Sequence, residues 1–147
     1  MYIYVNDQRN QFHLTNGKIS YIFHVLKNGG LGQLYFGRAL RHREDFSHLH
    51  VKDVPTPASC HYDLDDPAFT LETIRQEYPV AGKGDFRDAA IEIETNDGRL
   101  GNEFKYHGYE ISNGKPKLNG LPATYADKDD ATTLTIKLLD EKVGANL

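Results

Sequence analysis

Turn-forming Asn and Gly residues divide this sequence into short runs of β-branched and aromatic residues. The breaks fall at residues 16–17, 28–30, 96–98 and 113–114. Because Gly and Asn tolerate the positive φ that tight hairpin turns require, each break is a place where one strand can reverse into the next. This punctuation predicts an all-β chain rather than an α/β one.

The expected strands are the runs between the breaks, at residues 11–15, 18–26, 31–36, 89–94, 103–112 and 131–139. The Asn16-Gly17 step predicts a type I′ hairpin between the first two strands. Within 103–112 the aromatic residues change from even to odd positions near His107-Gly108. A one-residue β-bulge at that point would restore their common face.

The run at 19–26 is apolar on both faces. Tyr21 and Phe23 point to one side of the expected strand, and Ile22 and Leu26 point to the other. Such a strand needs cover on both sides, from a second sheet or from another chain. The residues alone leave both kinds of cover open.

Between residues 37 and 84 the alternation lapses. We expect a long loop here, and loops of this length inside a compact domain are usually functional or disordered. One short helical turn is expected at 71–78, since Thr70 can cap it and Pro79 ends it.

Composition limits the partners of this chain. The 147 residues carry 17 Lys+Arg against 21 Asp+Glu, a net charge of −4, so we expect neither nucleic acid nor an anionic membrane as a partner. The first residues do not resemble a signal peptide, and no run approaches the ~20 apolar residues that span a bilayer. Cys60 is the only cysteine, which excludes an intrachain disulfide and fits a reducing cytoplasm.

Several potential metal-binding side chains gather in the expected loop, namely His42, His48, His50, Cys60 and His61. Zinc would need them to converge at ~2.0–2.3 Å from the metal, and no helical or C-x2-C spacing organises them. The other interpretation, a solvated polar loop, is the one we expect, so the sequence assigns no metal. Cys60 and His61 are adjacent and do not form a catalytic pair, because neighbouring side chains diverge.

Other chemical motifs are incomplete. The acidic run at 63–66 has Ala68 and Ile74 where an EF-hand loop needs Gly and Glu, which leaves a different calcium site or a charged loop apex. Residues 82–86 lack the spacing and the hydroxyl residue of a phosphate-binding loop. From its residues alone the chain is a β domain without a visible active site and without a cofactor.

Three segments add a further observation. The first joins Gln-Phe-His-Leu at 11–14, Ser-Tyr-Ile at 20–22 and Gly-Leu-Gly-Gln-Leu-Tyr-Phe-Gly at 30–37. The second is Glu-Tyr-Pro-Val-Ala-Gly-Lys-Gly-Asp-Phe-Arg at 77–87. The third joins Gly-Lys-Pro-Lys-Leu-Asn-Gly-Leu-Pro-Ala-Thr-Tyr at 114–125 with Thr-Leu-Thr-Ile at 133–136. In this order they resemble the N-terminal region of bacterial α-galactosidases of glycoside hydrolase family 36.

The resemblance implies an antiparallel β-sandwich, with residues 1–147 as the N-terminal part of a β-supersandwich domain. The family's catalytic (β/α)8 barrel and C-terminal β-sandwich are absent from this chain. These enzymes are retaining glycosidases that use two barrel aspartates, so we expect no catalytic residue here. The implied function is to support the barrel and the assembly of a homo-oligomer, a tetramer in some members. The implied parent enzyme hydrolyses terminal α-galactosyl residues of short oligosaccharides such as melibiose and raffinose.

The resemblance also implies a contact with substrate. In tetrameric members, loops of this domain help to wall the galactose pocket of a neighbouring subunit. By position the 41–66 loop is the candidate, with Asp53 and Asp66 bonding sugar hydroxyls; the alternative is a solvated acidic loop.

The 77–87 segment has a structural interpretation. Gly82 and Gly84 are expected to meet the geometry of a turn, and Asp85 and Arg87 to form a structural ion pair.

A different class of function, an independent carbohydrate-binding β-sandwich, remains as the alternative. Such modules commonly stack sugars on Trp or Tyr, and this chain has no Trp but nine Tyr.

Overall fold

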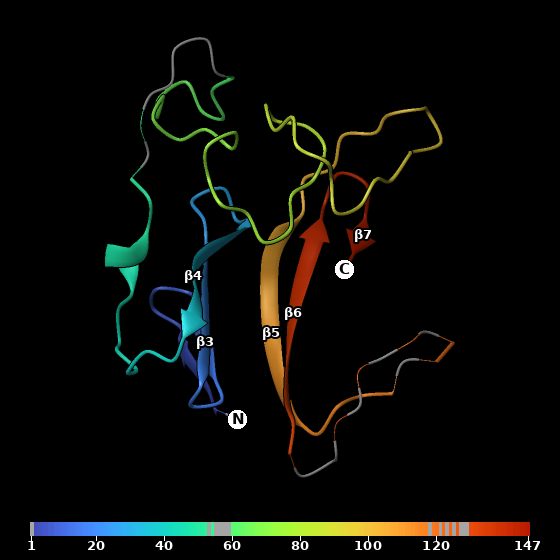
Figure 1. The fold of residues 1–147 in the computed structure, drawn as a ribbon. Coiled ribbons are helices and arrows are strands. Elements are labelled where there is room, and N and C mark those ends of the chain that lie inside the picture. The colour runs from blue at the N-terminus through green and yellow to red at the C-terminus, as the bar shows by residue number, and fades with distance from the viewer. Residues whose placement is uncertain are drawn as a thin grey trace.

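The computed structural model describes residues 2–52, 54, 60–117, 119–120, 122, 124, 126 and 130–147. The elements of this described part are β1 (Tyr2–Asn6), β2 (Gln11–Thr15), β3 (Ile19–Val25), β4 (Leu31–Arg38), the 3-10 helix η1 (Ser47–Leu49), β5 (Lys105–Asn113), β6 (Thr132–Asp140) and β7 (Ala145–Asn146). They form two antiparallel sheets, ordered β1-β2-β3-β4 and β5-β6-β7, which lie beside each other in Figure 1. The expectation of an all-β, antiparallel fold is confirmed. Within the described ranges no helix is long and apolar enough to cross a membrane.

The β2–β3 hairpin forms where the Asn16-Gly17 step predicts it, but its turn is not type I′. Gly17 has a φ of 80°, whereas Asn16 is not among the residues with positive φ, and a type I′ turn needs both. Instead, the Asn16 side-chain oxygen accepts hydrogen bonds from the backbone N–H groups of Lys18 and Ile19 at 2.9 and 2.8 Å. The side chain of Asn16 therefore closes the turn.

The expected β-bulge is confirmed. The register between β5 and β6 shifts between Tyr106 and Gly108, and Gly108 has a φ of 156°. After the shift Tyr109 pairs with Ile136, so the apolar residues on either side of the bulge share the face toward the first sheet.

The expectation of a strand at 89–94 is wrong. Its alternation is present, but no neighbouring strand pairs with it among the described residues. Ile91 makes one isolated parallel bridge to Val80, and the Ala90 N–H donates to the Pro79 carbonyl at 2.8 Å. A strand needs a continuous ladder of such bonds, and this segment makes only the start of one.

The expectation of a helical turn at 71–78 is also wrong, and the short 3-10 helix lies at η1 instead. After a turn at 71–73 the backbone runs along the open edge of β4. The Gln33 N–H donates to the Arg75 carbonyl at 2.8 Å, and the Glu77 N–H donates to the Leu31 carbonyl at 2.9 Å. The unpaired edge of β4 satisfies these backbone groups, which overrides the local helical preference.

The inner face of β3 packs against the second sheet. Phe12 on β2 is fully buried and stacks on Phe23 at 4.8 Å between ring centroids. Tyr109 on β5 meets the Phe12 ring edge-on at 5.4 Å, and Tyr106 lies at 6.0 Å. This aromatic cluster holds the two sheets together.

The outer face of β3 is covered by residues 39–49, which we call the strap. Ile22 and Leu34 are buried with Phe46 of the strap, and Leu40 and Leu49 pack at the edges of this cluster. Figure 1 shows the strap and η1 on the side of the first sheet that faces away from β5 and β6. Both faces of β3 thus find cover within one chain, one from the second sheet and one from the strap.

We expect Phe12→Ala to destabilise the fold by about 3–5 kcal/mol, because it removes a fully buried ring and leaves a cavity between the sheets. Urea unfolding followed by circular dichroism measures this loss. The matched control is Phe36→Ala, since Phe36 on β4 is 67% exposed and its truncation should change stability by less than ~1 kcal/mol. Equal losses in the two variants would contradict the role given to Phe12.

Candidate functional site

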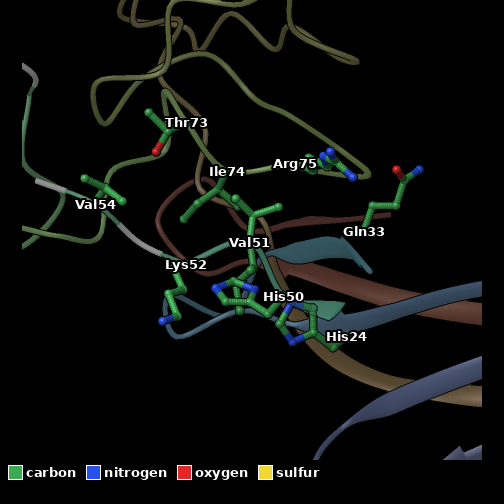
Figure 2. A pocket seen from close by; sticks show the side chains of 10 residues that line it. His24, Gln33, His50, Val51, Lys52, Val54, Thr73, Ile74 and Arg75 are labelled. Atoms are coloured by element: carbon green, nitrogen blue, oxygen red, sulfur yellow. The ribbon is translucent and has the colours of Figure 1, made fainter. Parts of the chain in front are cut away.

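A cavity of about 230 Å³ opens where the first sheet meets the long loop. The segments that surround it are the ends of β3 and β4, residues 50–52 with Val54, and the turn at 73–75. Its lining side chains are His24, Leu26, Gln33, His50, Val51, Lys52, Val54, Thr73, Ile74 and Arg75 (Figure 2).

The cavity combines apolar surface with polar groups. Leu26 and Ile74 belong to a buried hydrophobic cluster with Phe69 and Leu71, which forms a rigid base beneath it. The rings of His24 and His50 lie beside each other in Figure 2, with centroids 5.3 Å apart and their planes at 66°. A site of this composition suits a small polar molecule that presents both hydroxyl groups and C–H faces.

The turn at 73–75 is held by Arg87. Its guanidinium donates to the carbonyls of Ile74, at 2.7 Å, and of Leu71. The same side chain pairs with the Asp85 carboxylate at 2.9 Å, and Gln76 donates to the second Asp85 oxygen. One arginine therefore ties the cavity wall to a carboxylate whose side chain is 2% exposed.

Backbone geometry brings Asp85 into this position. Gly82 and Gly84 have φ values of 120° and 80°, and Lys83 between them has a φ of 54°. A Cβ at Gly84 would lie 2.5 Å from the Cβ of Cys60. Glycine is required at 84 both for its φ and for this close approach.

A charged centre joins the loop to the second sheet. The Glu103 carboxylate accepts hydrogen bonds from the Tyr62 hydroxyl and the Lys142 ammonium group, each at 2.6 Å, and Lys105 and Lys83 lie at 3.7 and 4.0 Å. Burial opposes ionisation of Glu103, but these hydrogen bonds and the nearby positive charges outweigh it and lower its pKa to about 2. Glu103 therefore stays ionised and anchors Tyr62 over most of the pH range.

The sequence analysis predicted that Asp53 and Asp66 lie at the rim of a sugar pocket. Asp53 lies outside the described residues. Asp66 pairs with Lys27 at 2.8 Å and does not line the cavity. The Asp66 side chain is 39% exposed and borders solvent. Its ion pair holds the Asp66 segment against Lys27, which follows β3.

The histidines considered for a metal site are dispersed. His42 of the strap lies against His13 of β2, and His48 packs on Phe46. His61 forms a hydrogen bond with the carbonyl of Pro67. In the described parts of the chain, no three His, Cys, Asp or Glu side chains come close enough together to hold a metal ion.

Sequence reasoning singled out His50, as a potential metal ligand, but missed the other residues that line the cavity. Gln33 lies on a strand whose pattern reads as ordinary β structure, and Thr73 and Arg75 lie in the segment expected to be helical. The only local signal was the loss of alternation between residues 37 and 84, which marks the region without indicating which side chains converge.

Comparison with known proteins agrees with this architecture. Residues 29–147 match the glycosyl hydrolase family 36 N-terminal domain. α-Galactosidase AgaA of Geobacillus stearothermophilus is 38% identical over 148 aligned residues, which cover 98% of this chain and 20% of AgaA. α-Galactosidase 1 of Pediococcus pentosaceus is 39% identical over 138 residues, covering 92% of this chain and 19% of that protein.

Solved structures give the same result. The crystal structure of the α-galactosidase from Lactobacillus brevis superposes with a TM-score of 0.91 at 34% identity, over 98% of this chain and 19% of that one. A variant of AgaA in complex with raffinose superposes with a TM-score of 0.84 at 36% identity, over 92% of this chain and 19% of that one.

These matches define an N-terminal β-sandwich domain of a glycoside hydrolase. The chain belongs to the glycosyl hydrolase family 36 N-terminal domain family, and its relatives are α-galactosidases. It spans about a fifth of the length of the relatives it matches.

We expect Arg87→Ala to cost on the order of 3 kcal/mol, because it leaves the buried Asp85 carboxylate without its cation. Arg99→Ala is a matched control, since Arg99 pairs with Asp97 at the same two-residue spacing and the same 2.9 Å but with both side chains exposed. That loss should stay below ~1 kcal/mol. Chemical denaturation measures both, and a comparable loss in the two variants would contradict the proposed anchoring of the cavity wall.

Proposed function

We propose that this chain is the first part of the N-terminal, non-catalytic domain of a retaining α-galactosidase. The barrel that carries out hydrolysis and the C-terminal β-sandwich lie outside these 147 residues. The parent enzyme removes terminal α-galactosyl residues from short oligosaccharides of the melibiose and raffinose type. We place it in the cytoplasm, where an exposed thiol such as that of Cys60 stays reduced.

The observation that carries this proposal is the agreement in both sequence and backbone with α-galactosidases over nearly the whole chain. Structures of AgaA have been solved in complex with raffinose and with stachyose, which are galactose-containing oligosaccharides. Those ligands belong to AgaA, and we extend their class to this chain on the basis of the shared family.

The cavity of Figure 2 gives the domain a role beyond support. Residues 50–52 and Val54 form one of its walls and belong to the loop that, by position, would reach a galactose pocket. Asp53 and Asp66 remain our candidates for contacts with sugar hydroxyls, Asp66 from the solvent side of its pair with Lys27.

The test is a chimera in which this chain replaces the corresponding fifth of AgaA. We expect the chimera to hydrolyse an aryl α-galactoside, whereas the 147-residue chain alone gives no turnover. Asp66→Asn in the chimera should raise KM for raffinose by about 3- to 10-fold, the effect of one lost hydrogen bond, and leave kcat unchanged. Asp97→Asn, on an exposed turn, is the control and should leave both constants unchanged.

Turnover by the isolated chain would overturn the non-catalytic assignment, and a folded but inactive chimera would overturn the family role. Isothermal titration of the isolated chain with melibiose and raffinose addresses the rival function. Binding at millimolar or tighter concentration would favour an independent carbohydrate-binding module.

We also propose that the domain takes part in assembly. An apolar cleft of about 270 Å³ lies between the sheets, lined in part by Leu14 and Tyr21 from one and Leu134 and Ile136 from the other. Beside these residues Phe36 is 67% exposed, and it pairs with Tyr21 in the β3–β4 register. An exposed apolar surface of this kind favours association.

We expect the isolated chain to self-associate, and multi-angle light scattering over a concentration series measures its mass. Phe36→Glu should shift the chain toward monomer, because it places a charge beside Tyr21, which meets the Phe36 ring edge-on and lines the cleft. Phe86→Glu is the control, since Phe86 is 78% exposed and follows Asp85 at the glycine turn of residues 82–84 rather than packing on Tyr21. A strict monomer at high concentration would contradict the assembly role.

A further inference from the structure

One of the hydrogen-bond networks that link the strap to the first sheet passes through His13. His13 on β2 is 2% exposed, and its Nδ1 lies 3.2 Å from Nδ1 of His42 in the strap. Its Nε2 lies 2.8 Å from the hydroxyl oxygen of Ser20 on β3, which is fully buried. The Leu40 N–H of the strap donates to the same oxygen at 2.9 Å. The Leu40–His42 end of the strap is therefore tied to the sheet at two points that share one imidazole.

The positions of the protons follow from this arrangement. Within the described part of the chain, the Ser20 hydroxyl is bonded to the Leu40 N–H, from which its oxygen accepts, and to His13 Nε2, which is therefore the acceptor for its hydrogen. His13 is then neutral with its hydrogen on Nδ1, and it donates that hydrogen to Nδ1 of His42. In this set of hydrogen bonds, every donor has an acceptor only when both imidazoles are neutral.

A proton added to either ring breaks this pattern. On His13 it would occupy Nε2 and face the hydroxyl hydrogen of Ser20. On His42 it would occupy Nδ1 and face the hydrogen on Nδ1 of His13. In both cases a buried donor loses its acceptor, and two protonations would also place two positive charges side by side.

We propose that the His13–His42 pair is an acid-sensitive latch, which holds the Leu40–His42 end of the strap on the sheet while both rings are neutral and releases that end when the pair takes up a proton. The rest of the strap keeps its own contacts, since Gln11 of β2 forms hydrogen bonds with Asp45, Phe46 and Ser47. Acid therefore loosens the start of the strap and leaves the wall of the cavity in Figure 2 in place.

The groups around the two rings in the described part of the chain include an aromatic ring and charged residues of both signs. The Tyr4 ring of β1 stacks on His42 at 4.0 Å between centroids. Arg43 and Glu44 of the strap border the same small space as the two rings, with opposite charges. Asp45 pairs with Arg9 at 3.3 Å, and its hydrogen bonds to Ser47 lower its pKa to about 2, so its charge is constant near neutral pH.

The direction of the pH effect follows from His13. Burial and then the neighbouring His42 lower its pKa from the ordinary value of 6.5. A released His13 therefore binds a proton more readily than a latched one. The stabilisation by the latch is fully present above pH 6.5 and is lost as the pH falls through the lowered pKa.

The test is amide hydrogen exchange measured by NMR on the 147-residue chain between pH 7.5 and 5.0. The protection factor of the Leu40 amide should fall about tenfold for each unit by which the pH drops below 6.5, and should level off once the lowered pKa of His13 is passed. The Tyr106 amide, which donates to Gly29 at 2.7 Å between the sheets, is the internal control and should keep its protection.

Two variants complete the test. His13→Gln retains a donor and an acceptor but cannot be protonated, so the Leu40 protection should no longer depend on pH. His48→Ala removes an exposed histidine of the same strap and should keep the full acid response. If His13→Gln fails to fold, the wild-type titration still decides, with the ring signals of His13 and His42 followed alongside. A constant Leu40 protection factor in the wild type, or an equal acid response in folded His13→Gln, would overturn the proposal.

Discussion

The structure depends on covering β3 on both faces. Its inner face is closed by the aromatic cluster around Phe12, which joins the two sheets. Its outer face is closed by the strap, through Phe46 and the fully buried Ile22. Uncovered apolar faces are costly in water, so the position of every later segment follows from how these two faces are buried.

Covering the outer face with a loop has a consequence for function. A loop that contributes core residues cannot move freely. Because Phe46 and Leu49 of the strap pack in the core, the residues that follow Leu49 start from a fixed position. On the opposite side of the cavity, the turn at 73–75 is held by Arg87 and by pairing with the edge of β4. Both walls of the cavity are therefore fixed by buried contacts, which is the arrangement expected of a loop region that must present a defined shape to a partner or ligand.

Much of the fold was predictable from local patterns. Strand β2 has the predicted bounds, and the bulge in β5 follows from the shift of aromatic residues at Gly108. Two segments misled the prediction for the same reason. Residues 89–94 alternate like a strand but lack a partner ladder, and residues 71–78 carry helix end signals but pair with β4. The spacing of apolar residues shows which backbone conformations a segment tolerates. Whether the segment pairs as a strand depends on which backbone lies beside it in the fold.

The candidate site was less accessible to prediction. The glycines at 82 and 84 and the Asp85–Arg87 pair could be singled out because their spacing is local. The lining of the cavity comes from four separate segments, and the loss of alternation alone could not identify them.

The sequence by itself determined the fold class, the family and the positions of the turns, because these depend on residues that are close together along the chain. The tertiary structure alone decided that the strap covers β3, that His13 meets His42, and that Glu103 gathers Tyr62 and Lys142 from distant segments. Those contacts join residues 29 to 41 positions apart, so their formation depends on how the whole chain closes on itself and not on any local preference.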